Sequence, residues 1–181
     1  MTPELAITRH GPAETLALCD EILPVYAAAE ADQMHDPFYG EEQFLHRLVD
    51  LYAPGRDFEL VTARLGGVMI GFAFGNPRDK TAAIWESVGK ALPDVVVPEE
   101  PQPVYVFREL NVLPDYQGRG YGRALHDALL ASRPERLAHL LVRPDNPARF
   151  AYGSWGWRKV GTQQPFPDSP VFDEMVKTLP L

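Results

Sequence analysis

The sequence predicts a mixed α/β (α+β) protein with one central sheet of about six or seven strands, flanked by about four helices. Strand-like apolar runs alternate along the chain with stretches that repeat apolar residues at helical spacing. In the second half, an apolar strand leads through a glycine-rich turn directly into a helix, an order typical of α/β folds. The length of 181 residues suits a single domain over 1–181.

The first half of the chain supplies two predicted helices and a hairpin. Glu4–Thr8 alternates like a strand, and Glu14–Ile22 has helical spacing up to Pro24, which should break or kink the helix. Ala31–Gly40 is expected to be a loop, and Glu41–Tyr52 is expected to be a second helix. Two strands joined by a Leu-Gly-Gly turn then predict a hairpin over Phe58–Arg64 and Val68–Phe74.

The second half predicts a long connection and the rest of the sheet. Asn76–Pro103 should contain a short helix near Thr81–Leu92, and the loop Gly161–Pro170 should precede the last strand. The other predicted elements are the strand Val104–Val112, the helix Arg123–Ser132, the strand His139–Val142 and the strand Val171–Leu179. The predicted order is β-α-α-β-β-β-α-β-α-β, with the fourth strand at the centre of the sheet.

Composition narrows the functional classes. The formal net charge of −8 argues against nucleic acid as a partner. No apolar run approaches 18 residues, so no membrane span is expected. The single cysteine, Cys19, cannot form an internal disulfide, which is consistent with a reducing, cytoplasmic location. The five histidines show no metal-ligand spacing, so no metal is expected.

Residues 111–122 read N-V-L-P-D-Y-Q-G-R-G-Y-G and predict an anion site. A glycine turn points backbone N–H groups outward, and a following helix adds partial positive charge at its N-terminus, so linked phosphates are the expected ligand. A P-loop would need Lys-Ser/Thr after Gly120, where Tyr121 stands. A dinucleotide-binding turn would start directly after the strand and place its third glycine one position beyond Gly122.

A third template, Q/R-x-x-G-x-G/A, is satisfied by Gln117, Gly120 and Gly122. On this motif the chain resembles the GNAT superfamily of N-acetyltransferases. A second segment supports the resemblance with residue types common in that family: Asn146, Ala148-Arg149, Tyr152 and Gly156-Trp157, with Trp157 in place of the usual Phe. The resemblance covers roughly residues 104–161, a third of the chain.

The resemblance implies a GNAT fold, with the sheet splayed at its fourth strand, and acetyl-CoA as co-substrate without a metal. It implies that backbone groups of Leu110 and Val112 pair with the pantetheine amides, and that Asn146 contacts the pantetheine arm or caps the following helix. The pyrophosphate would lie on the turn, whose expected ligands are Gln117, Gly118, Arg119, Gly120, Tyr121, Gly122 and Arg123.

Two side chains are candidates for the chemistry. Glu109 interrupts an apolar strand, where burial would raise its pKa and suit it to take a proton from the attacking amine. The structural alternatives are pairing with Arg108 or Arg123, or solvation at an opening of the sheet. The resemblance implies that Tyr152 hydrogen-bonds the CoA sulfur and can protonate the leaving thiolate, whereas a core tyrosine is the alternative. The predicted activity is acetyl transfer to a primary amine of a small molecule by direct attack in a ternary complex.

The acceptor is expected between the two long segments Ala31–Gly40 and Asn76–Pro103. Both carry carboxylates and aromatic side chains, which suit a cationic or aromatic amine, although solvated loops are the equal alternative. The carboxylates are Asp32, Asp36, Asp94, Glu99 and Glu100; the aromatics are Phe38, Tyr39 and Trp85. Other functions stay open: a non-catalytic CoA-binding module, transfer of another acyl group, an alcohol as acceptor, and a protein N-terminus or lysine as acceptor. The chain is expected to be a monomer or a homodimer.

Overall fold

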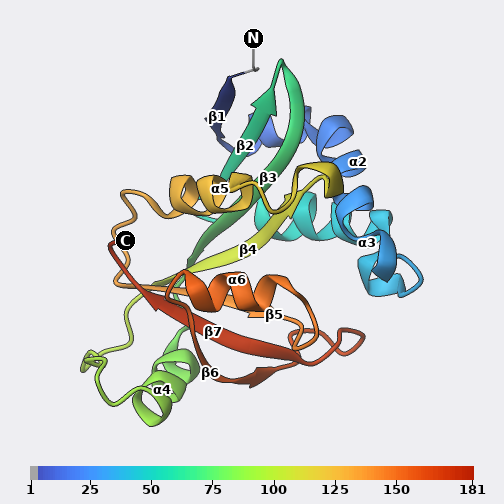
Figure 1. Cartoon of the computed structure of the whole chain (residues 1–181). Coiled ribbons are helices and arrows are strands. Elements are labelled where there is room, and N and C mark those ends of the chain that lie inside the picture. The colour runs from blue at the N-terminus through green and yellow to red at the C-terminus, as the bar shows by residue number, and fades with distance from the viewer. Residues whose placement is uncertain (1–3) are drawn as a thin grey trace. The chain divides into compact units, whose positions relative to one another are not determined.

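Seven strands and six α-helices are distributed along residues 4–181, which are the residues that the computed structural model describes (Figure 1). The strands are β1 (Leu5–His10), β2 (Glu59–Leu65), β3 (Val68–Arg78), β4 (Val104–Val112), β5 (Leu137–Val142), β6 (Arg158–Gln163) and β7 (Phe172–Thr178). The helices are α1 (Pro12–Ala17), α2 (Cys19–Ala29), α3 (Glu41–His46), α4 (Ala82–Ala91), α5 (Tyr121–Leu130) and α6 (Ala148–Ser154). The mixed α/β class predicted from the sequence is confirmed.

The chain divides into two compact units that exchange segments. Unit 1 holds the residues up to Asn76 together with 108–131, and unit 2 holds 77–107 and 132–181. The boundary falls inside β4, so this strand contributes its first four residues to unit 2 and its last five to unit 1. Hydrogen bonding links the strands in the order β1-β2-β3-β4-β5-β7-β6, which places β4 at the centre as predicted.

In unit 1, an antiparallel meander leads from the edge of the sheet to β4. β1 pairs with β2, and β2 pairs with β3 around the predicted hairpin turn, where Gly66 and Gly67 have φ of 56° and 84°. β3 approaches the end of β4 closely: the Leu113 N–H donates to the Ile70 carbonyl at 2.8 Å. A Cβ on Gly71 would lie 2.8 Å from the Asn111 carbonyl oxygen, so this position requires glycine.

The core of unit 1 lies between this meander and α2 and α3. Tyr26 and Phe44 stack with ring centroids 3.8 Å apart, and Phe44 also contacts Phe72 and Phe74 of β3. Each fully buried apolar side chain of this kind stabilises the fold by roughly 1.5–3 kcal/mol. On the sheet, α5 packs against β2. These contacts fix the helices that carry the polar side chains described below.

The helices of unit 1 differ from the sequence prediction in two places. The first helix breaks at Leu18 (φ −94°, ψ 0°), and Pro24 lies inside α2 without ending it. Pro24 has no N–H, so it removes one helical hydrogen bond, to the carbonyl of the exposed Asp20. The predicted helix Glu41–Tyr52 has the expected extent, but Arg47–Tyr52 forms a π-helical turn, labelled η3, closed by the Ala53 N–H on the Leu48 carbonyl.

In unit 2, β4 pairs in parallel with β5, β5 pairs antiparallel with β7, and β7 pairs antiparallel with β6. The strand β6 was missed in the sequence, where only one strand was expected after Gly161. Its sequence, RKVGTQ, has no buried residue, and it lies at the edge of the sheet. Arg158 and Lys159 are typical of edge strands, where charge discourages pairing with other chains.

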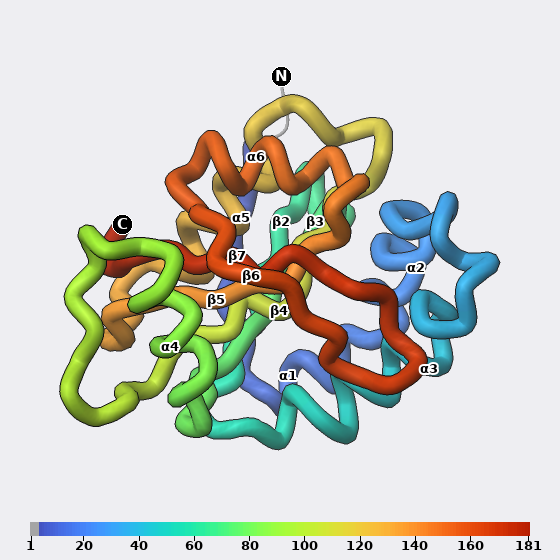
Figure 2. The backbone as a smooth tube through the Cα atoms, turned by 90° about the horizontal axis from the view of Figure 1, so that it is seen from below, coloured from blue at the N-terminus to red at the C-terminus, as the bar shows by residue number. Residues whose placement is uncertain are grey.

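The predicted short helix of the Asn76–Pro103 segment is confirmed as α4, which contacts β6 (Figure 2). Its apolar face, Ile84, Trp85 and Val88, packs on Val104 and Val106 of β4 within the core of unit 2. The Trp85 Nε1–H and the Thr81 hydroxyl both donate to the Gln102 carbonyl at 2.8 Å. These two bonds fasten the far end of the long segment to the helix.

Candidate active site

The predicted anion-binding turn lies between a short 3₁₀ turn, η4 (Pro114–Tyr116), and the N-terminus of α5. Gly118 and Gly120 have φ of 72° and 86°, a left-handed conformation that strongly favours glycine. A Cβ built on either residue would meet nothing within 4 Å, so the turn borders open space. Gly120 is the N-cap of the ten-residue helix α5. Open space next to the first N–H groups of a helix is the geometry that a phosphate requires.

Side chains around the turn are held by contacts within the chain. The Gln117 Nε2 donates to the Val112 carbonyl at 2.9 Å, which ties the turn to the end of β4. The Arg123 Nε donates to the Asp127 carboxylate at 2.8 and 2.9 Å, which offsets part of its positive charge. The exposed Arg119 lies over the Tyr116 ring, with its guanidinium carbon 5.8 Å from the ring centre. Arg119 is therefore the better placed of the two arginines to add positive charge at the turn.

Glu109 lies on β4 within unit 1, directly before the Leu110–Val112 end of the strand. Its side chain is partly exposed, yet loss of water around the carboxylate is the largest cause that raises its pKa, to about 8. Glu30 adds to the increase because it brings a second negative charge, whereas the Arg47 guanidinium opposes it. At neutral pH most of the Glu109 carboxyl is therefore protonated, and it ionises just above that range.

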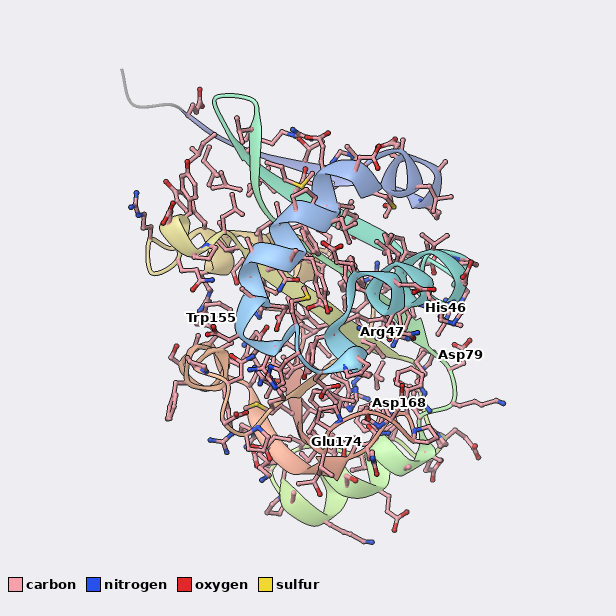
Figure 3. All side chains as sticks on the ribbon, turned by 90° about the vertical axis from the view of Figure 1, so that its right-hand side faces the viewer. His46, Arg47, Asp79, Trp155, Asp168 and Glu174 are labelled. Carbon is pink, nitrogen blue, oxygen red and sulfur yellow. The ribbon has the colours of Figure 1, made fainter. Side chains whose placement is uncertain are left out.

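Three further side chains surround Glu109 and were missed in the sequence: Glu30, Arg47 and Asn111. The Asn111 Nδ2 donates to the Glu30 Oε1 at 3.1 Å, which joins the end of α2 to β4. Arg47 stands on η3 and donates to the Phe38 carbonyl at 2.9 Å. Figure 3 shows its side chain nearer the middle of the view than that of the exposed His46. Glu30, Arg47 and Asn111 come from separate segments of the chain, so no sequence motif contains all three.

Tyr152 lies on α6 in unit 2 and is 8% exposed. Its ring makes edge contacts with Phe107 of β4, Trp155 and Trp157, with centroid distances of 5.6–6.3 Å. Gly156 allows this arrangement because its φ of 90° turns the chain, so that the Trp157 N–H returns to the Tyr152 carbonyl at 3.1 Å. The Gly156-Trp157 pair of the motif therefore orients the tyrosine.

The position of α6 is fixed at both ends. The Asn146 Oδ1 accepts the Ala148 N–H at 2.9 Å, the capping contact expected as one of its two roles. Arg149 forms an ion pair of 2.5 Å with Asp173 of β7, a carboxylate that is almost fully buried and also paired with Lys159 at 2.7 Å. At the other end, the Lys177 Nζ donates to the Trp155 carbonyl at 2.7 Å. These contacts hold Tyr152 on a firmly placed helix, which the role predicted for it would require.

The sequence matches the acetyltransferase (GNAT) family over residues 26–157, which is well over half of the chain. The chain belongs to the GNAT family of acetyltransferases. Its class is therefore that of the acyltransferases, as predicted from the glycine turn. The match reaches well into the first half of the chain, beyond residues 104–161, on which the resemblance rested. No curated protein sequence matches the chain significantly.

Solved structures confirm the predicted GNAT fold. PH1933 from Pyrococcus horikoshii OT3 is 20% identical, with a TM-score of 0.69, over 98% of this chain and 100% of that chain. The ribosomal-protein-S18-alanine N-acetyltransferase from Escherichia coli is 19% identical, with a TM-score of 0.62, over 98% and 96%. The PaiA N-acetyltransferase from Thermoplasma acidophilum, solved with coenzyme A, is 13% identical, with a TM-score of 0.51, over 97% and 99%.

The residues predicted for the GNAT site fall into one group in each unit. Unit 1 brings Glu109, Leu110, Val112 and the glycine turn together along one stretch of chain, and unit 2 holds Asn146 and Tyr152. The Val112 carbonyl already accepts a hydrogen bond from Gln117. The pairing expected between Val112 and pantetheine would therefore use the Val112 N–H. No group of three or more His, Cys, Asp or Glu within residues 4–181 is arranged to hold a metal ion. No helix in the same range is long and apolar enough to cross a membrane.

The two long segments of this GNAT protein give several of their side chains local structural roles. Asp36 caps the 3₁₀ turn η2 (Pro37–Tyr39) by accepting the Phe38 N–H at 2.9 Å, and Phe38 and Tyr39 are buried. Asp94 pairs with Arg158 at 2.9 Å. With Trp85, these two residues line a hollow of about 290 Å³ in unit 2 that does not include Tyr152 among its lining residues.

We predict that Gly120→Glu weakens acetyl-CoA binding at least tenfold, because it places a carboxylate and a strained backbone where phosphates approach. Gly67→Glu is the matched control. Gly67 has nearly the same φ and open surroundings, in the hairpin turn of the same unit. The control variant should bind acetyl-CoA like the wild type in calorimetry. Equal affinity of the two variants would show that the site is elsewhere.

Proposed function

We propose that this protein transfers the acetyl group of acetyl-CoA to the primary amine of a small molecule, by direct attack in a ternary complex. The observation that carries the proposal is the Glu109 carboxyl, which lies on β4 one residue before Leu110 and has a pKa raised to about 8. It shares unit 1 with the glycine turn and the N-terminus of α5. A base and an anion site on one continuous stretch of chain suit acyl transfer from a phosphate-bearing donor.

A base is needed because the attacking amine is protonated at neutral pH. An alkylamine with a pKa of about 10.4 is only about 0.04% neutral at pH 7, which corresponds to about 4.6 kcal/mol. An ordinary glutamate, with a pKa near 4.3, is a weak acceptor for that proton. Burial beside Glu30 raises the pKa of Glu109 to about 8, so that it lies only about two units below the pKa of the amine. Proton transfer to a positioned base is efficient over such a difference.

Acetyl-CoA fits the residues at the turn and, when bound, supplies an activated acetyl thioester. The N–H groups of residues 118–122 and Arg119 would hold its pyrophosphate, and the Leu110 and Val112 backbone would align its pantetheine arm. In the overall reaction, a C–N bond forms as the C–S bond breaks. The protonated amine and the thioester give an amide, a thiol and one proton. Glu109 takes a proton from the amine nitrogen and releases it to water.

Tyr152 is the proposed partner of the departing sulfur. Its hydroxyl has a reference pKa of about 10, above the value of about 8.5 for a thiol, so complete proton transfer would be uphill by about 2 kcal/mol. A hydrogen bond that strengthens as negative charge develops avoids that cost. The aromatic contacts and the ion pair of α6 support this role because they restrict where the hydroxyl can lie.

The proposal of a small acceptor is tested with an acetyl-CoA-dependent thiol-release screen over amino acids, polyamines, aminoglycosides and peptides. Because the chain is acidic and carries carboxylates in both long segments, cationic small amines should give the highest kcat/KM, with a preference that falls as salt rises. Replacing Asp36 and Glu99 by Asn and Gln should reduce that preference. A screen in which only peptides release thiol would move the acceptor to the protein class, and an anionic best substrate would contradict the proposal.

We predict that Tyr152→Phe lowers kcat by roughly ten- to a thousandfold while acetyl-CoA affinity stays within about twofold, because the hydroxyl acts only as thiolate charge develops. Tyr105→Phe is the control, since Tyr105 is a fully buried tyrosine of the same unit, and the Arg133 guanidinium lies over its ring. If the two variants have the same turnover in single-turnover assays, Tyr152 has a packing role only.

We predict that Glu109→Gln lowers kcat/KM at least tenfold and flattens its pH profile. The wild-type rate should rise with pH and level off above about 8, because the carboxyl is a base only when ionised. Gln keeps the shape of the side chain but cannot titrate in this range. An unchanged profile in E109Q would show that another group or bulk water takes the proton.

A further inference from the structure

We propose that Glu30, Glu109 and Asn111 form a subsite that binds the acceptor as a primary ammonium ion, with Glu30 as the fixed negative charge. The inference rests on the proposed function, because it names the ionic form in which the amine enters. Glu30 belongs to neither the glycine turn nor the thioester chemistry. Its place is the C-terminal end of α2, where it accepts the Asn111 Nδ2 hydrogen bond at 3.1 Å.

The three side chains lie at one place in unit 1. Glu109 and Asn111 are two residues apart on β4, so both project from the same face of the strand. Glu30 is near enough to Glu109 for their charges to interact. The hydrogen bond between Glu30 and Asn111 also fixes the orientation of the Asn111 amide, because a carboxylate can only accept. The Oδ1 of the same amide is then the atom that this hydrogen bond leaves unused.

The Asn111 Oδ1 is the observation that points to a ligand. Asn111 is 3% exposed, and among the residues that the structure describes its Oδ1 has no hydrogen-bond partner. An unsatisfied acceptor at such burial costs about 1–3 kcal/mol, which a ligand with an N–H donor would recover. The subsite thus contains two carboxyl groups and one amide oxygen, and once Glu109 is ionised it offers only acceptors.

A primary ammonium ion matches this set of acceptors. It carries three N–H donors, no acceptor and one positive charge. Quaternary ammonium ions carry the charge without the donors, and alcohols carry a donor without the charge, so both should bind more weakly. When the ammonium is bound, one N–H proton passes to the Glu109 carboxylate, which leaves a neutral amine and a neutral carboxyl group. Glu30 neither gives up nor gains a proton in this step, so it remains beside the site for the next cation.

Other groups near Glu109 affect its pKa but do not take the place of a bound cation. Arg47 lies on η3 and opposes the negative charge, but its guanidinium donates to the Phe38 carbonyl and lies 4.3 Å over the Phe38 ring. The Tyr26 and Tyr52 hydroxyls also interact with Glu109, and burial is the largest cause that raises the pKa of each. Both are therefore neutral at working pH. The pair of carboxylates is left as the site for a cation.

The test is a carbon-13 NMR titration of the Glu109 carboxyl in the protein without acetyl-CoA, with its signal assigned by its loss in E109Q. Ethylammonium chloride is compared with sodium chloride and tetramethylammonium chloride at equal ionic strength. In the wild type, ethylammonium should lower the Glu109 midpoint by about half a unit or more, and tetramethylammonium should lower it less, because a bound cation favours the ionised form.

Glu30→Gln removes the negative charge beside Glu109 and keeps a side chain of nearly the same size. In E30Q the Glu109 midpoint should fall even without a ligand, and most of the ethylammonium effect should disappear. Glu30→Asp, which keeps the charge, should retain the raised midpoint. Glu42→Gln is the control, since Glu42 is an exposed residue on α3 of the same unit and should behave as the wild type.

The inference is overturned if E30Q and the wild type give the same midpoint and the same response to ethylammonium, or if tetramethylammonium is as effective as ethylammonium. These outcomes are separate from the fate of the proposed function. Acetyl transfer to amines together with no ammonium effect would refute only the subsite. An ammonium effect lost in E30Q, without acetyl transfer to any amine, would refute only the reaction.

Discussion

The chemistry proposed for this protein depends on one physical constraint: a carboxylate on the central strand is kept from water next to a second carboxylate. Glu109 can be a base for an amine only because burial and the charge of Glu30 raise its pKa to about 8. The site costs folding free energy whenever Glu109 is ionised. The apolar core of α2, α3 and β3 offsets that cost and holds Glu30 in position. The Gly71 position lets β3 approach the same part of β4.

The parts of the fold that the sequence predicts are those with a local signal. The glycine turn needs positive φ at Gly118 and Gly120, and the structure has it at both. The hairpin, α4 and β4 were predictable because each buries a continuous run or face of apolar residues, which is visible in the sequence. β6 was missed because an edge strand needs no buried residue, and the break at Leu18 was misplaced to Pro24 because proline is only one way to interrupt a helix.

The candidate site was predictable only where it coincides with a motif. Glu109 could be named because a carboxylate in an apolar strand is unusual, and Tyr152 because of its spacing from Asn146. Glu30 and Asn111 have no such signal, since they are 81 residues apart in sequence and meet only through tertiary packing. Whether the Asp36 and Glu99 segments hold the acceptor stays a prediction. Asp36 already caps a local turn, so Glu30 and Glu109 are a simpler source of attraction for a cation.

The most direct test of the central claim is the free energy of unfolding of the wild type and E109Q between pH 5 and 9. A carboxyl whose pKa is about 8 when folded and near 4.5 when unfolded binds more protons in the native state over this range. The wild type should therefore lose stability relative to E109Q as pH rises, by on the order of a few kcal/mol, and the difference should level off above pH 8. A difference that stays constant from pH 5 to 9 would show that Glu109 is an ordinary, solvated carboxylate and would contradict the account.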